Sequence, residues 1–202
     1  MSERTFIRVG SLALAAVVAA ASAGCGDVVR QGRSPAYLVI GKMFAASGAA
    51  PDERSDELSS DVLTNGGVVE DLGIADMRIA LKDIGQSASP TTPTSNNFIT
   101  VSRYRVSYRR SDGRNTPGVD VPYAFDGAST LTVTESDTTL SFVIVRIQAK
   151  LEPPLKNLRD GGGSAAISTI ADVTFYGRDQ VGNDVSATGS ISVNFADWAD
   201  PQ

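Results

Sequence analysis

Strict alternation of apolar and polar residues is the feature that most constrains the fold of this chain. From Val185 to Phe195 the apolar side chains share one parity, and Ser, Thr and Asn take the other. The segment around Met77, Ile79 and Leu81 repeats the pattern. A half-buried strand has this period of two, whereas an amphipathic helix repeats every 3.6 residues. Beyond the first 25 residues no sustained helical period occurs, so we expect an all-β domain.

Runs of this kind recur along the chain and are separated by short turn signals, among them Ser111-Asp112-Gly113 and Asp126-Gly127. The phase switches near Ser102–Arg103, which predicts a β-bulge. We expect segments 45–60 and 85–97 to be loops, with one helical turn near 52–58. The pattern favours an antiparallel immunoglobulin-like β-sandwich of about seven to nine strands over an up-and-down barrel. The expected strands lie within 36–44, 72–84, 98–110, 119–125, 130–134, 140–151, 171–176 and 185–195.

The first residues have the composition of a signal peptide. Arg4 and Arg8 form a short basic region, and an apolar run of 12 residues follows from Gly10 to Ala21. A membrane-spanning helix needs about 20 apolar residues, so this run is too short to span a bilayer. A basic start, a short apolar run and small residues after it are typical of a cleavable export signal. We therefore expect residues 1–24 to be removed.

Cys25 is the only cysteine, and it ends this segment. Ala23-Gly24-Cys25 resembles the lipobox of bacterial lipoproteins, although Ser22 stands where that family has an aliphatic residue. The resemblance implies a lipid on the Cys25 sulfur. A second reading is an A-x-A site at Ala21-Ser22-Ala23, which would give cleavage before Gly24. Domain boundaries follow: 1–24 signal peptide, 25–35 lipidated tether and 36–198 a single β-sandwich.

The lipobox resemblance also implies a location. A lipidated Cys25 would hold the domain on a membrane of the bacterial cell envelope. In enteric bacteria, Asp directly after the cysteine retains lipoproteins in the inner membrane. Here Gly26 follows the cysteine and Asp27 comes one residue later, so the resemblance favours the outer membrane.

Composition excludes several classes of function. The chain has no histidine, which removes Ser-His-Asp catalysis and histidine-ligated zinc. A single cysteine removes Cys-rich metal sites and disulfides within the chain. Without Glu3, Arg4 and Arg8, the totals of 18 basic and 23 acidic residues leave a net charge of −6. An acidic domain does not attract nucleic acid by its overall field. We expect no enzyme activity, no metal and no cofactor.

Two resemblances add to this interpretation. The stretch Phe175–Gly189, with an aromatic strand end, Gly182-Asn183 and an alternating strand, resembles the F–G hairpin of bacterial immunoglobulin-like and fibronectin-III-like domains. The stretches Arg105–Pro122 and Gln148–Asn183 are similar to a group of uncharacterised predicted bacterial lipoproteins. The first resemblance implies a fold. The second resemblance gives no indication of what the protein does.

Two sets of residues are candidates for binding. Arg103, Arg105 and Arg109 share one strand face and are predicted to meet a ligand or partner, or else to pair with carboxylates on a neighbouring strand. Asp179, Asn183 and Asp184 offer oxygen ligands for Ca²⁺, but Asp and Asn also form turns through side-chain-to-backbone hydrogen bonds.

Three functions remain open. The leading one is a non-enzymatic envelope lipoprotein that binds or scaffolds another envelope protein. The alternative is a module for envelope glycans, using aromatic side chains at Tyr104, Tyr108, Tyr123, Tyr176 and Trp198. A less favoured alternative is a hydrolase that uses a pair of carboxylates; its candidates are Asp112, Asp120 and Asp126.

Overall fold

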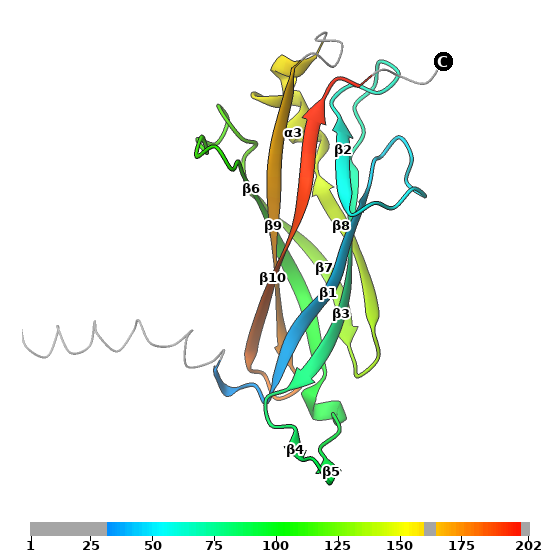
Figure 1. Ribbon diagram of the computed structural model, residues 1–202, viewed down its shortest axis with the longest axis vertical. Coiled ribbons are helices and arrows are strands. Elements are labelled where there is room, and N and C mark those ends of the chain that lie inside the picture. The colour runs from blue at the N-terminus through cyan, green and yellow to red at the C-terminus, as the bar shows by residue number, and fades with distance from the viewer. Residues whose placement is uncertain (1–31, 160–164, 199–202) are drawn as a thin grey trace, which may run out of the picture.

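The computed structural model describes residues 32–159 and 165–198, and these residues form a sandwich of two β-sheets (Figure 1). One sheet has three strands in the order β1-β3-β8, and the other has five in the order β2-β10-β9-β6-β7. Strands of the three-stranded sheet are β1 (Ala36–Ala46), β3 (Asp71–Leu81) and β8 (Thr138–Val145). Those of the five-stranded sheet are β2 (Glu57–Asp61), β6 (Ile99–Arg109), β7 (Phe125–Val133), β9 (Ala166–Asp179) and β10 (Asp184–Ala196).

The prediction of an all-β sandwich is confirmed. The order places the first and last strands of the domain as in immunoglobulin-like sandwiches, with β9 and β10 in the positions of strands F and G. Nearly all neighbours are antiparallel, but β2 runs parallel to β10 from Glu57 to Asp61. A small hairpin of two short strands, β4 (Gly85–Gln86) and β5 (Ser89–Pro90), and the 3₁₀ helix η1 (Ser95–Asn97) lie in the predicted loop 85–97.

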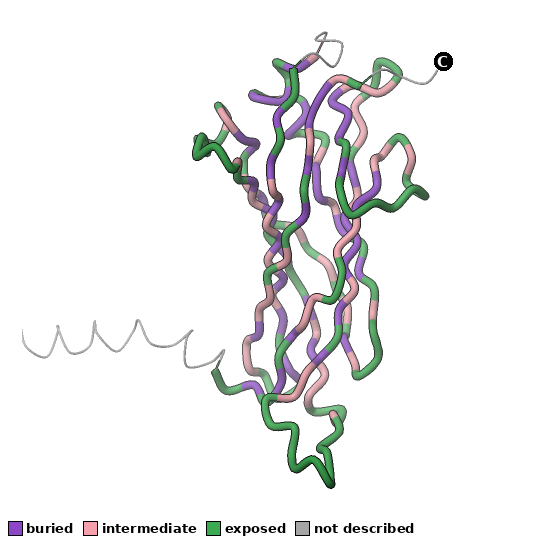
Figure 2. Tube along the Cα trace, viewed as in Figure 1, coloured by how far each residue is buried: buried purple, intermediate pink, exposed green. Residues whose placement is uncertain are grey.

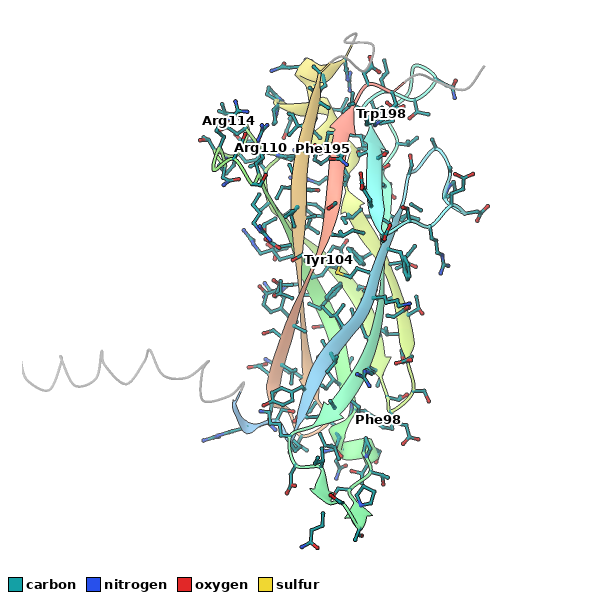
Figure 3. The ribbon with its side chains drawn as sticks, viewed as in Figure 1. Phe98, Tyr104, Arg110, Arg114, Phe195 and Trp198 are labelled. Carbon is teal, nitrogen blue, oxygen red and sulfur yellow. The ribbon has the colours of Figure 1, made fainter. Side chains whose placement is uncertain are left out.

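Apolar side chains of one parity in each sheet make the core, as Figure 2 shows along the strands. An aromatic cluster lies at its centre. Phe142 lies between Tyr104 and Phe175, with a ring-centre distance of 5.2 Å to each. Tyr104 and Phe195 project from the five-stranded sheet into the interior (Figure 3). Each buried aromatic side chain removes a large apolar area from water, so this cluster contributes strongly to stability.

Four local predictions differ from the structure. Segment 57–61 is strand β2, although we expected a loop there. The expected strand at 119–125 is a loop, and β7 begins only at Phe125. The turn expected at Asp126-Gly127 therefore lies within a strand. The expected strand 140–151 ends at Val145 and continues as the short helix α3 (Ile147–Leu151).

The two ends of the sandwich carry different elements. At one end the described chain begins, beside the β9–β10 turn and the β4–β5 hairpin (Figure 1). At the other end lie α3, the 3₁₀ helix η2 (Leu155–Leu158) and the last described residues. A tether that precedes β1 would therefore attach at the β9–β10 turn end. Within the described residues, no helix is long and apolar enough to cross a membrane.

Candidate functional site

The three candidate arginines lie on β6, on the outer face of the five-stranded sheet. Arg105 pairs with Asp126 of β7 at 2.7 Å, and Arg109 pairs with Asp172 of β9 at 2.6 Å. These are the cross-strand ion pairs that the sequence offered as one alternative. Arg103 is placed differently, because its nearest carboxylate oxygen, on Asp126, is 3.7 Å away.

Arg103 lies instead over an aromatic ring. Its guanidinium carbon is 4.2 Å from the centre of the Tyr176 ring, on the neighbouring strand β9. The predicted bulge places it there, because the pairing of β6 with both neighbours shifts between Val101 and Arg103. Ser102 and Arg103 both face solvent as a result. A cation above a ring face is held by the quadrupole of the ring, so the guanidinium has a preferred position without a full ion pair.

The candidate calcium residues lie at the β9–β10 turn, and their oxygens have protein partners. Asp179 accepts hydrogen bonds from the backbone N–H groups of Val181 and Asn183 and from the Asn183 side chain. Burial raises the pKa of the Asp179 carboxyl, but the hydrogen bonds from Asn183, Ser34 and Val181 outweigh burial, and the pKa lies below its ordinary value. These contacts match the turn-forming alternative. In the part of the chain that is described, no three acidic, histidine or cysteine side chains group as metal ligands.

Asp184 has a different partner from Asp179. Its carboxylate pairs with Arg178 at 2.7 Å across the first pair of the β10–β9 ladder. Arg178 is well exposed, so the pair has a small effect on stability. The Arg178–Asp184 pair matters for its position, because it places a guanidinium and a carboxylate beside the Arg103–Tyr176 contact.

These groups line one hollow of about 410 Å³, which we call the bulge hollow. Its lining residues are Ser102, Arg103, Tyr176, Gly177, Arg178, Asp184 and Val185. The structure thus brings together one residue from each candidate set, Arg103 and Asp184. Two guanidinium groups and one carboxylate line the hollow, which leaves one positive charge in excess. Guanidinium groups bind carboxylates through paired N–H donors, so the excess positive charge favours an anionic group in the hollow.

Sequence reasoning missed Arg178 as a member of this site and gave Tyr176 another role. Tyr176 stands on the polar parity of its strand, which was the available signal that it faces outward. The pairing of Arg103 with Tyr176 depends on the register across the bulge, and a single sequence does not fix that register.

The proposed aromatic platform is divided between the core and separate surfaces. Tyr104 and Tyr108 are buried, with exposed fractions of 4% and 6%. Tyr123 and Trp198 are exposed, and Tyr176 lies in the bulge hollow. One face of the Tyr176 ring is covered by Arg103. The five rings therefore do not form one stacking surface.

The three carboxylates considered for hydrolysis have separate partners. Asp112 pairs with Arg110 and Arg114 in the loop after β6, where Figure 3 labels both arginines; the Arg114 side chain is exposed and the Arg110 side chain is mostly covered. The Arg110 side chain, helped by Arg114, lowers the pKa of Asp112 well below its ordinary value. Asp120 accepts a hydrogen bond from the Thr116 backbone, and Asp126 pairs with Arg105. Each carboxylate is thus held by a neighbouring group.

Cys25, the predicted signal peptide and most of the predicted tether lie outside the described residues. Comparison of the chain with protein-family models, with curated proteins and with solved structures finds no match.

Proposed function

We propose that this chain is a lipid-anchored protein of the bacterial cell envelope whose sandwich binds an acidic segment of another envelope protein in the bulge hollow. The proposal makes the domain a non-enzymatic binding module. The observation that carries it is the meeting of Arg103, Tyr176, Arg178 and Asp184 in one exposed concavity.

Charge favours an acidic occupant. The domain as a whole is acidic, with a net charge of −5 over the full sequence, so a locally positive hollow is a distinct feature of its surface. Arg178 already has a carboxylate partner in Asp184, whereas Arg103 has none closer than 3.7 Å. A carboxylate from a partner would complete the coordination of Arg103, and the fixed Tyr176 contact would hold the guanidinium in place for it.

We favour a protein segment over a sugar ring as the occupant of the hollow. Sugars bind by stacking on a free aromatic face, and Arg103 covers one face of Tyr176. A glycan module remains the second function, and the experiment below separates the two.

The position of the hollow agrees with lipid anchoring at Cys25. Arg178 and Asp184 flank the β9–β10 turn, and the described chain begins at that end of the sandwich. A tether from a membrane would keep the bulge hollow near the lipid surface. We propose the outer membrane as the location, on the sequence pattern Cys25-Gly26-Asp27.

Nuclear magnetic resonance titration of the isotope-labelled full chain tests the hollow. The probes are a glutamate-only peptide, a lysine-only peptide and a neutral cell-wall oligosaccharide. We expect the glutamate peptide alone to shift the signals of Arg103, Tyr176 and Arg178, with weaker binding as salt is added. Shifts caused by the oligosaccharide alone would favour the glycan function, and shifts spread over the surface or absent would contradict both.

A charge-reversal pair supplies the control. Arg103→Glu should abolish the effect of the glutamate peptide, because it reverses the charge that lacks a close partner. Arg114→Glu changes an exposed arginine of the loop after β6 and should leave the titration unchanged. Equal loss in both variants would mean that net charge, and not the hollow, attracts the peptide.

A further inference from the structure

The sandwich contains a fully buried lysine–aspartate pair far from the bulge hollow. Lys150 Nζ lies 2.8 Å from Asp71 Oδ2, and neither side chain is exposed to solvent (0% each). Asp71 is the first residue of β3, and Lys150 belongs to α3, so the contact joins segments that are distant in sequence. Removing two charges from water is costly, and their mutual attraction offsets that cost only in part.

The two oxygens of Asp71 are held by different donors. Oδ1 accepts the backbone N–H of Gly48 at 2.9 Å, and Oδ2 accepts the Ser60 hydroxyl at 2.6 Å. The Gly48 backbone packs tightly there, because a Cβ at this position would lie 2.1 Å from the Glu70 carbonyl oxygen. The carboxylate is therefore fixed, with a polarising donor on Oδ1 and a hydroxyl on Oδ2.

The lysine nitrogen lies close to that carboxylate without an aligned hydrogen bond. Within the described residues, Nζ has no hydrogen-bond acceptor in suitable geometry, even though Oδ2 is 2.8 Å away. The nearby buried hydroxyl of Tyr108 donates to the Ile144 carbonyl and is not an alternative partner. Arg159 donates to the Lys150 carbonyl oxygen and restrains the backbone of α3. The nitrogen is thus held beside a carboxyl group in a site that excludes water.

From this geometry we propose that Lys150 and Asp71 condense to an intramolecular amide bond. Nζ transfers one proton to Oδ2, which gives a neutral amine and a neutral carboxylic acid. The Nζ lone pair then attacks Cγ, and the Cγ–Oδ2 bond breaks. A second Nζ proton joins the departing oxygen, so that one water leaves and one N–H remains on the amide. No oxidant, reductant or other reactant is required.

Two neighbouring groups, the Gly48 N–H and the Ser60 hydroxyl, assist this reaction. The Gly48 N–H lies where negative charge develops on Oδ1 during the attack, as an oxyanion donor does. Ser60 hydrogen-bonds the oxygen that leaves as water. Fixed proximity replaces the entropy loss of a bimolecular reaction. Because neither side chain is exposed, bulk water is kept away from the reacting groups.

The amide bond would stabilise this domain as a disulfide stabilises other exported domains. The chain has one cysteine, so no disulfide can form within it. An amide between β3 and α3 would close a long loop and reduce the conformational freedom of the unfolded chain. It would also remove two buried charges, which is a change that a disulfide does not make.

Mass spectrometry of the denatured full chain tests the proposal. Apart from the mass changes due to signal-peptide removal and lipidation at Cys25, we expect the wild type to be lighter than its sequence mass by one water. Trypsin should then yield one branched species, in which peptide Ser55–Arg78 is joined to peptide Ile147–Lys156 with no cleavage at Lys150. Lys150→Met should show neither change. Lys156→Met alters an exposed lysine nearby and should keep the water loss.

Other outcomes would overturn the proposal. A wild type without this water loss, cleaved normally at Lys150, would mean that the pair is a buried ion pair only. Water loss confined to Asp112-Gly113 or Asp126-Gly127 would indicate succinimide formation at an Asp-Gly step. Both results come from the wild-type protein, so the test stands even where a variant does not fold. Ser60→Ala should slow the water loss.

Discussion

The Arg103 guanidinium lies 4.2 Å from the centre of the Tyr176 ring, at the place where β6 shifts its register against β9. The bulge turns two successive residues of β6 toward solvent and so opens the hollow beside this contact. A local irregularity of the sheet therefore shapes the surface of the domain at this place. Bulges commonly redirect a side chain next to a functional site.

A double-mutant cycle measures that contact. Arg103→Ala and Tyr176→Leu together should show a coupling of about 0.5–1 kcal/mol in the free energy of urea unfolding, the range of an exposed cation–π pair. Arg105→Ala with Tyr176→Leu is the matched control, because Arg105 pairs with Asp126. Fully additive effects for Arg103 and Tyr176 would mean that their contact does not fix the guanidinium.

The Asp179 turn gives a second prediction. Asp179→Ala removes three hydrogen bonds in the turn and should lower the free energy of unfolding by about 1–3 kcal/mol at neutral pH. Asp184→Ala breaks an exposed ion pair and should cost less than about 1 kcal/mol. Added Ca²⁺ should leave the wild-type melting temperature unchanged; an increase that Asp179→Ala abolishes would support the calcium alternative instead.

The cost of Asp179→Ala should depend on pH. The folded-state pKa of Asp179 lies below its ordinary value, despite burial, because of the hydrogen bonds from Asn183, Ser34 and Val181. Its stabilising contribution is present above the unfolded-state pKa of about 3.9 and is lost as pH falls through the folded-state value. The free energies of urea unfolding of the wild type and of Asp179→Ala should therefore converge as the pH decreases. A difference that stays constant down to the acid limit would contradict this explanation.

Tyr108 gives a prediction at alkaline pH. Burial raises the pKa of its hydroxyl. The unfolded chain therefore loses this proton first, and the free energy of unfolding should fall as pH rises above about 10. Tyr108→Phe leaves the Ile144 carbonyl without its donor and should cost about 1–2 kcal/mol at pH 7. In the variant the free energy of unfolding should also fall less steeply at alkaline pH. An equally steep fall would mean that other groups, such as Tyr104, cause it.

Gly127 tests the packing of the aromatic core. A Cβ at this position would lie 2.2 Å from the Tyr104 ring, so Gly127→Ala should destabilise the domain by about 1–3 kcal/mol. Gly67→Ala is the control, because its Cβ would meet only the Thr64 carbonyl oxygen at 3.5 Å. Chemical denaturation of both variants measures the difference. Equal, small losses would show that the Tyr104 ring moves aside readily.

The alternation of apolar and polar residues was enough to predict the strands that have one buried face. The β9–β10 hairpin and the bulge in β6 lie where the pattern placed them, because the core selects one parity and a phase change marks an extra residue. Strand β2 escaped prediction because its backbone is stabilised by pairing with β10, a contact between distant segments. Gly127 looked like a turn residue, but it lies in β7, where the Tyr104 ring occupies the space of its missing side chain.

Residues 146–151 show the limit of pattern reasoning most clearly. Ile147, Ala149 and Leu151 alternate with polar residues and resemble a strand, which predicts that Lys150 faces solvent. In the structure this segment is helical, Ile147 and Leu151 are exposed, and Lys150 is buried against Asp71. Lys150 and Asp71 form an ion pair between distant segments, so neither local sequence indicates that its charged residue is buried.

Site-specific photo-crosslinking tests the proposed function most directly. A photoreactive residue replaces Ser102 in the bulge hollow, or exposed Ser141 on the opposite sheet as a control, in the full chain in its native membranes. We predict one discrete protein adduct from position 102 that disappears when Arg103→Glu and Arg178→Glu are added. No adduct from position 102, the same adduct from position 141, or an adduct that survives both charge reversals would contradict partner binding in the hollow.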